Sequence, residues 1–152
     1  MYPNSGYRVN NDLIINKWEI PEENEEILQE IFARAYIYRN RVQETLCQIY
    51  LRINSIWYSI VIDAGDVFGR KENEPPVSFE EGNGEFAYPV FKTKEMKLLE
   101  NQKIKNIEMK RSGGIVLIVI SFNNGVNATI QEDNDTCKLF ISGKNIKYKE
   151  ET

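Results

Sequence analysis

One run of the chain is apolar at every position. Residues 115–120 are all isoleucine, valine or leucine, and Gly113 and Gly114 precede them. β-Branched side chains dominate the run and favour a pleated strand, and the run is too short to cross a membrane as a helix. Because neither face of such a strand is polar, the pattern predicts a central strand that is covered on both sides.

The N-terminal half shows a different spacing. Pro21 precedes four glutamates, which suits the first turn of a helix, and no glycine or proline interrupts residues 22–53. Apolar residues recur every three or four positions, as one stripe of a helix requires: Leu28, Ile31, Ala35, Tyr38, Val42 and Ile49. The spacing predicts one long helix over 22–53. The alternative is a helix that ends near Tyr38, followed by a strand from Thr45 to Ile53.

Shorter segments complete the predicted fold. Strand-like composition occurs at 12–20, 56–62, 85–91, 126–131 and 136–142, and Thr93 is a suitable N-cap for a short helix near 93–102. Asn124 and Gly125 predict a hairpin with a type I′ turn. We therefore expect an α+β fold, in which a mainly antiparallel sheet with a C-terminal β-meander packs against one long or two shorter N-terminal helices and the short helix.

The totals indicate an ordinary soluble protein. The chain has 152 residues, of which 41% are hydrophobic and 28% charged, so we expect a single domain over 1–152. Residues 1–11 are interpreted as a loose lead-in and 144–152 as a frayed tail. No signal-peptide pattern is visible, and Cys47 and Cys137 are predicted to be buried, reduced thiols of a cytoplasmic protein.

The charge and the lack of histidine narrow the classes of function. A net charge of −4 argues against nucleic acid as a partner, and no segment suggests a membrane. Without histidine, Ser-His-Asp and Cys-His nucleophiles are excluded, and zinc binding is disfavoured. The sequence therefore predicts no cofactor and no metal, and it favours a protein that is not an enzyme.

Residues 63–85 form an acidic stretch rich in glycine and proline. It contains seven acidic and two basic residues, and we interpret it as a long functional connection. Asp63, Asp66 and Glu85 are candidates for general acid–base or divalent-metal chemistry, although a solvated acidic loop is the simpler interpretation. Gly82 and Gly84 do not precede a helix, which argues against a phosphate-binding loop. The lysine-rich segment 92–111 is interpreted as a solvated helix face.

Aromatic residues supply the strongest functional hint. Seven of them cannot all be buried with every hydroxyl satisfied: Tyr36, Tyr38, Trp57, Tyr58, Phe68, Phe86 and Tyr88. Exposed aromatic rings beside acidic side chains are typical of protein interfaces. The sequence thus predicts a small acidic protein-binding module that docks on a basic partner surface, for example an inhibitor or a toxin-immunity protein.

The residues predicted to contact that partner lie in or beside the acidic stretch: Asp63, Asp66, Phe68, Glu72, Glu74, Glu80, Glu81, Glu85 and Tyr88. Two alternatives remain open. One is a carboxylate-based enzyme or a small-ligand or metal-binding domain that uses the 63–85 loop. The other is an assembly subunit that joins its neighbours through an edge strand such as 12–20 or 85–91.

Overall fold

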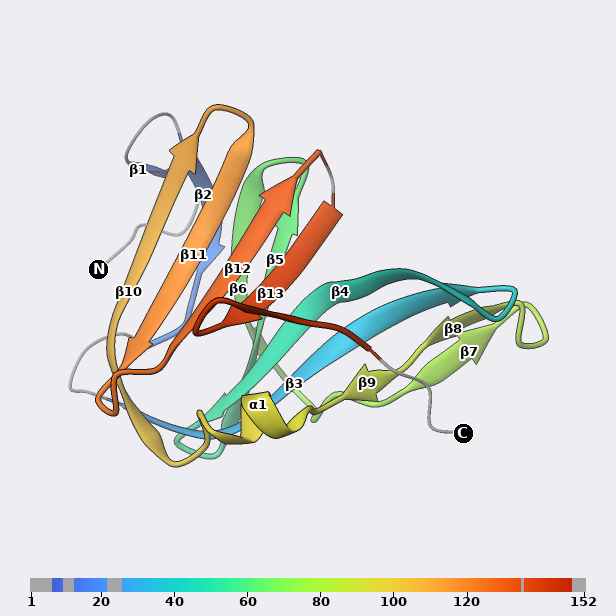
Figure 1. Ribbon diagram of the computed structural model, residues 1–152, viewed down its shortest axis with the longest axis horizontal. Coiled ribbons are helices and arrows are strands. Elements are labelled where there is room, and N and C mark those ends of the chain that lie inside the picture. Colours follow the sequence, from blue (N-terminus) through green and yellow to red (C-terminus); the bar gives the residue numbers. More distant parts are fainter. Residues whose placement is uncertain (1–6, 10–12, 22–25, 135, 149–152) are drawn as a thin grey trace.

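The computed structural model describes residues 7–9, 13–21, 26–134 and 136–148, and these residues are almost entirely in β-strands. The described strands form one 14-stranded sheet, antiparallel except where β2 pairs with β6 (Figure 1). In chain order they are β1 (Tyr7–Val9), β2 (Leu13–Trp18), β3 (Ile27–Tyr38), β4 (Arg41–Ile53), β5 (Ile56–Asp63), β6 (Asp66–Glu72), β7 (Phe79–Glu81), β8 (Phe86–Tyr88), β9 (Val90–Phe91), β10 (Gln102–Ser112), β11 (Ile115–Phe122), β12 (Asn127–Asp133), β13 (Thr136–Ile141) and β14 (Lys144–Ile146). A short helix, α1 (Lys94–Lys97), precedes β10.

The sheet folds back on itself, so that two portions of it lie face to face. In Figure 1, β10 to β13 lie in front of β2, β5 and β6. We call β1 to β6 the N-terminal layer and β10 to β14 the C-terminal layer. β3 joins the two layers, because it pairs with β4 along most of its length and with the start of β10 through Ile27 and Leu28.

The core lies between the layers. Inward side chains of both layers belong to one apolar cluster; Leu51 and Ile60 come from the N-terminal layer, and Val116 and Ile118 from the C-terminal layer. All four are at most 1% exposed. At one end of the sandwich the backbone N–H of Gly65 donates to the carboxylate of Glu132 over 2.8 Å, which ties the β5–β6 turn to β12. Burial of apolar surface between the layers is therefore the main stabilising contribution.

The predicted long helix over 22–53 is wrong. Residues 22–25 lie outside the described part of the chain, and the rest is the hairpin of β3 and β4. The turn residues Arg39 and Asn40 both have positive φ, at 48° and 65°, as a two-residue type I′ hairpin requires. Asn54 and Ser55 turn the chain in the same way into β5. The turn at Arg39 and Asn40 contains no glycine or proline, so the sequence pattern did not reveal it, whereas a break at Asn54 and Ser55 was expected between residue 53 and the predicted strand at 56–62.

The residues of the predicted helical stripe do not form one buried face. Leu28, Ile31 and Ala35 are buried, whereas Val42 is 40% exposed. Burial instead follows every second residue at 31, 33, 35 and 37, and again at 49, 51 and 53. The alternative interpretation of 45–53 as a strand is therefore correct for the backbone, and β-branched and aromatic side chains explain why the strand prevails over the helix.

The expectation that β11 is covered on both faces is also wrong. Val116, Ile118 and Ile120 are buried in the core, whereas the side chains at 115, 117 and 119 are half-buried on the outer face. The register places Leu117 between Lys110 and Gln131. Long polar side chains cover apolar neighbours with their methylene stems, so a second layer is not needed there.

Several smaller elements agree with the sequence in kind but differ in detail. Thr93 caps α1 through its side chain, which accepts from the N–H of Met96, but the helix ends at Lys97. The C-terminal meander is present as β11 to β13. Its first hairpin has a four-residue connection, in which Gly125 has positive φ and Asn124 does not, so the predicted type I′ turn is wrong.

Other segments are more ordered than the sequence suggested. The acidic stretch 63–85 contains β6 and β7, and Asp63 and Asp66 pair across a two-residue turn. β1 lies in the predicted lead-in and β14 in the predicted tail. The side chain of Cys137 is buried, whereas the side chain of Cys47 lies outside the described part. Within the described residues, no helix has the length and hydrophobicity that crossing a membrane requires.

A glycine at the contact of β2 and β6 gives a test of this packing. A Cβ atom added at Gly69 would lie 2.5 Å from Cε3 of the buried Trp18 ring. We expect Gly69→Ala to lower the free energy of unfolding by about 1–3 kcal/mol, because the indole has no room to move without strain. Urea unfolding followed by circular dichroism measures this change.

The matched control is Gly114→Ala, since nothing lies within 4 Å of a Cβ added there. Its free energy of unfolding should change by less than about 0.5 kcal/mol. Equal urea midpoints for the two variants would contradict the parallel packing of β2 against β6.

Candidate functional site

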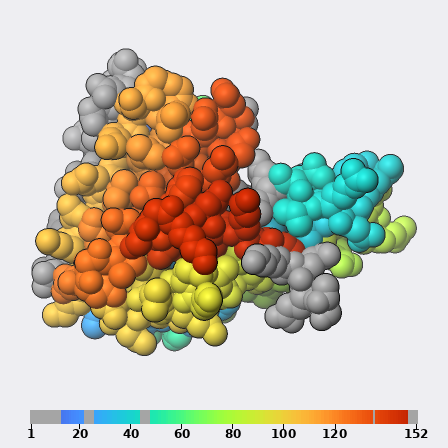
Figure 2. Space-filling view, viewed as in Figure 1, coloured from blue at the N-terminus to red at the C-terminus, as the bar shows by residue number. Residues whose placement is uncertain are grey.

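The hairpin of β3 and β4 extends beyond the strands that flank it. β5 pairs with β4 only from Ile49 to Ile53, so among the described residues the earlier part of β4 pairs with β3 alone. On the other side of β3 lie β8 and β9, and β7 pairs with β8. We call residues 34–48 and 79–88 the arm. Figure 1 shows the arm projecting from the two layers, and in Figure 2 it forms a lobe set apart from them.

Five rings on the outer face of the arm form what we call the aromatic ladder: Tyr36, Tyr38, Phe79, Phe86 and Tyr88. Ring centroids are 4.7 Å apart for Phe79 and Tyr88, 5.3 Å for Tyr88 and Tyr36, 6.5 Å for Tyr36 and Phe86, and 5.2 Å for Phe86 and Tyr38. Phe79 is 43% exposed, and the other four are half-buried. Each stacked pair adds about 0.5–1.5 kcal/mol beyond its buried area, so the ladder is a continuous and stable surface.

The ladder follows from strand pairing. Phe79 lies opposite Tyr88 in the β7–β8 pair, and Phe86 lies opposite Tyr38 in the β8–β3 pair. Residues two apart in a strand share a face, so the alternating aromatic positions of β3 and β8 point to the same side. The sequence therefore builds the ladder through period-two spacing.

The buried Arg34 side chain connects the strands of the arm, and we call it the brace. It is only 7% exposed, and its guanidinium donates to the hydroxyl of Tyr50 over 3.0 and 3.1 Å and to the carbonyls of Val77 and Tyr88 over 3.0 and 2.7 Å. The same group lies 5.1 Å from the centroid of Phe79. One side chain thus fixes β3, β8 and the segment before β7 relative to one another, and it holds the ladder in one geometry.

Acidic side chains border the ladder. Segment 72–85 contains five glutamates and no basic residue. Among them, Glu85 accepts from Nε of Arg39 over 2.9 Å, and the Arg39 guanidinium lies 5.1 Å from the centroid of Tyr38. Partial burial, together with the charge of Glu85, raises the pKa of the Tyr38 hydroxyl.

The nine residues predicted to contact a partner divide into three groups. Glu80, Glu81, Glu85 and Tyr88 lie together on the arm. Phe68 and Glu72 lie on the outer face of β6, where Phe68 contacts Arg70 and Glu72 accepts from Ser59. Asp63 and Asp66 flank the β5–β6 turn, and Glu74 is exposed in the connection before β7.

Five residues of the arm are absent from the nine predicted contacts: Arg34, Tyr36, Tyr38, Phe79 and Phe86. Tyr36, Tyr38 and Phe86 appear only among the seven aromatic residues singled out in the sequence, and Arg34 and Phe79 in neither group. The alternation of Phe32, Arg34 and Tyr36 is the sequence signal for the members from β3, because it places all three on one strand face.

The carboxylates do not converge as an enzyme site or a metal site would need. No group of three or more potential metal ligands occurs among the described residues. Asp63 is exposed at a hairpin end, and Glu85 lies on the arm in an ion pair with Arg39. Of the three carboxylates proposed for such chemistry, Asp63 and Asp66 thus lie at the β5–β6 turn and Glu85 lies on the arm.

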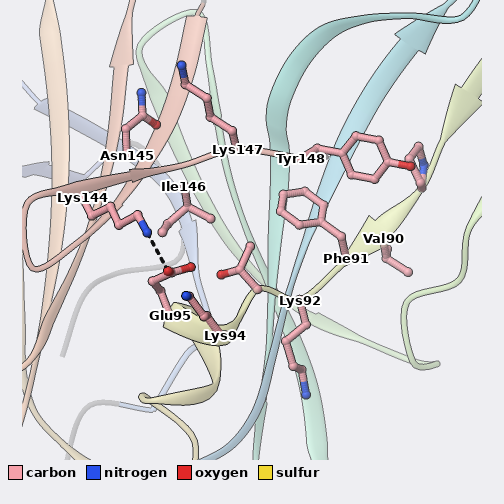
Figure 3. Close-up of a pocket in the computed structure, with 12 residues that line it drawn as sticks. Val90, Phe91, Lys92, Lys94, Glu95, Lys144, Asn145, Ile146, Lys147 and Tyr148 are labelled. Atoms are coloured by element: carbon pink, nitrogen blue, oxygen red, sulfur yellow. Dashed lines mark hydrogen bonds and ion pairs between the residues drawn. The ribbon is translucent and has the colours of Figure 1, made fainter. Parts of the chain in front are cut away.

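A second concave surface lies between α1 and β14 (Figure 3). This cleft has a volume of about 1000 Å³. Lys144 reaches across to Glu95 over 2.7 Å, and Phe91 and Tyr148 form an edge-to-face pair at the other end. Lys92 contributes to the lining, but its ammonium group lies over the ring of Phe32.

Two ion pairs match three of the five charged residues that line the cleft, whereas Lys94 and Lys147 form no ion pair among the described residues. Lys92 pairs with Glu100, and Glu95 pairs with Lys144. The arm instead presents exposed rings beside unmatched carboxylates, so it is the stronger candidate site.

Comparison with known proteins adds no further information. No protein-family model matches the chain, and neither the curated proteins nor the solved structures give a match. The functional argument therefore depends on the geometry of the arm.

The brace can be tested with Arg34→Met, which keeps the length of the side chain and removes its donors. The carbonyls of Val77 and Tyr88 would lose the guanidinium that donates to them, so we expect the free energy of unfolding to fall by about 2–3 kcal/mol. Amide hydrogen exchange should quicken in β7 and β8 more than in β11. Arg52→Met is the control, because the partly exposed pair of Arg52 and Glu30 should contribute less than about 1 kcal/mol. Uniform loss of protection in both variants would contradict a local brace.

The cleft yields a prediction on pH. The hydrogen bond from Lys144 is the largest cause that holds the pKa of Glu95 below its ordinary value. Lys144→Met should raise that pKa toward the ordinary glutamate value, as measured by carboxyl-carbon NMR titration. A lowered pKa stabilises the fold above the ordinary value and loses this effect as pH falls through the lowered pKa. The two proteins should therefore differ in urea midpoint at neutral pH and converge in acid; an unchanged Glu95 titration would contradict the pair.

Proposed function

We propose that this chain is a protein-docking module, and that the outer face of the arm binds a partner with a basic surface. The observation that carries the proposal is the aromatic ladder, where five half-buried or exposed rings lie on the arm with Glu80, Glu81 and Glu85. Aromatic side chains are enriched in the centres of protein interfaces.

The rigidity of the arm supports this role. Arg34 fixes the strands that carry the ladder, and the stacked rings limit each other's rotation. A surface that is ordered before binding loses less conformational entropy when a partner docks. The ladder therefore has the properties of a preformed interface centre.

The acidic border supports a basic partner. Carboxylates around an apolar centre raise the association rate with a cationic surface, and they disfavour acidic competitors. Glu80 and Glu81 are exposed in β7 and are available for such contacts. An inhibitor or immunity-type protein would use this arrangement to cover a basic functional surface of its target.

Affinity capture followed by reconstitution tests the proposal. The intact chain is used as bait at about 0.05 M salt, and bound proteins are eluted at about 0.5 M salt, where exposed charges are screened. A recovered protein is then purified, and its dissociation constant is measured by calorimetry. We expect the double variant Phe79→Ala with Phe86→Ala to weaken binding about thirtyfold or more, as the loss of an interface centre does.

The matched control truncates two exposed apolar residues outside the arm, Ile27→Ala with Leu98→Ala. This control should bind the purified partner as the unaltered chain does. Binding that survives the arm variant, or that the control variant abolishes, would refute docking through the arm.

A further inference from the structure

β7 is a marginal strand of the arm. Among the described residues it pairs with β8 alone, and its three residues are all exposed. A strand with one free edge presents N–H and C=O groups that another extended segment can pair with. The arm therefore combines a docking face with an edge that accepts a strand.

The side chains of β7 divide between the two faces of the arm. Phe79 stacks on Tyr88 and so lies on the ladder side, and Glu81, two residues later, shares that side, whereas Glu80 points to the other. Phe79 ends the ladder at the free edge and remains 43% exposed. No basic residue of the described chain forms an ion pair with Glu81. A ring and a carboxylate thus stand side by side at the edge.

The arm already shows which cation suits such a site. Arg39 lies over the ring of Tyr38 while its Nε donates to Glu85, so a ring and a carboxylate hold one guanidinium together. Arg34 lies over Phe79 itself, at 5.1 Å. Both contacts join a guanidinium to an aromatic ring of the ladder. Phe79 and Glu81 repeat the combination of a ring and a carboxylate, but among the described residues no arginine pairs with Glu81.

We propose that the arm recognises an extended, arginine-bearing segment that adds to β7 as a further strand. Two arginines two residues apart would lie on one side of that strand, about 7 Å apart, which matches the spacing of Phe79 and Glu81 along β7. The first guanidinium contacts the exposed part of the Phe79 ring, and the second forms a bidentate pair with the Glu81 carboxylate. This inference rests on the proposed function and specifies the chemistry of its partner.

Arginine is preferred over lysine for physical reasons. A guanidinium is planar, stacks on aromatic faces and is less strongly hydrated than an ammonium, and its paired donors fit a carboxylate. A lysine would reach the same places as a compact, strongly hydrated charge. The site should therefore distinguish the two cations although both carry one positive charge.

Synthetic peptides test the proposal with the intact chain. The probe is a blocked pentapeptide of threonine, arginine, valine, arginine and threonine, and calorimetry measures its dissociation constant. We expect it to bind about tenfold more tightly than the same peptide with lysine in both positions. A peptide with the two arginines adjacent should lose a similar factor, because one of them then faces away from the ladder.

Variants locate the contact. Phe79→Leu keeps an apolar side chain without a ring, and Glu81→Gln keeps the shape without the charge; each should remove most of the preference for arginine. Glu108→Gln, an equal change of charge on the exposed face of β10, should leave the preference intact. Both β7 positions are exposed, so these variants should fold, and circular dichroism checks that they do.

The possible results separate this inference from the proposed function. Equal binding of the arginine and lysine peptides, or of the adjacent and spaced arginines, overturns the inference. If the captured partner still depends on Phe79 and Phe86 in that case, docking through the arm stands without strand addition at β7. If neither the preference for spaced arginines nor the dependence of partner binding on Phe79 and Phe86 is observed, the inference and the proposed function are both overturned.

Discussion

The hairpin of β3 and β4 is longer than the core that it covers, and this mismatch determines the rest of the structure. Its strands have 12 and 13 residues, whereas β5 pairs with β4 over only Ile49 to Ile53. At about 3.4 Å per residue, each strand spans roughly 40 Å. The part near Leu28 and Leu51 is buried between two layers, and the remainder has to be stabilised outside them.

The arm replaces the missing second layer with interactions inside a single layer. On its outer face, stacked rings bury part of each other's surface, and Arg34 satisfies carbonyls that a second layer would otherwise cover. Burying a guanidinium against neutral oxygens costs free energy, since among the described residues no carboxylate forms an ion pair with Arg34 to offset the loss of hydration. The same arrangement leaves Phe79 at the margin of the ladder, where the side chain is 43% exposed.

The sequence predicted the C-terminal half better than the N-terminal half, and the reason is physical. Around β11, β12 and β13, glycine, asparagine and aspartate mark the turns, and the strands are short and rich in β-branched residues. In β3 and β4 the apolar residues fit both a helical spacing and an alternation, and the turns at Arg39 and Asn54 lack glycine and proline. Only long-range pairing with β5, β8 and β10 decides between the two, and a single sequence does not display that pairing.

The candidate site was predictable in composition but not in arrangement. Acidic and aromatic residues near 63–88 suggested an interface, and the arm does gather Glu81, Glu85 and Tyr88. Asp63 was grouped with them only because it is near in sequence, and strand pairing carries it to a separate hairpin turn. Arg34 was missed because its role depends on Tyr50 and Val77, which lie far from it along the chain. A ladder that is held rigid and yet left open to solvent departs from what stability alone favours, and such departures in natural proteins concentrate where a surface is used.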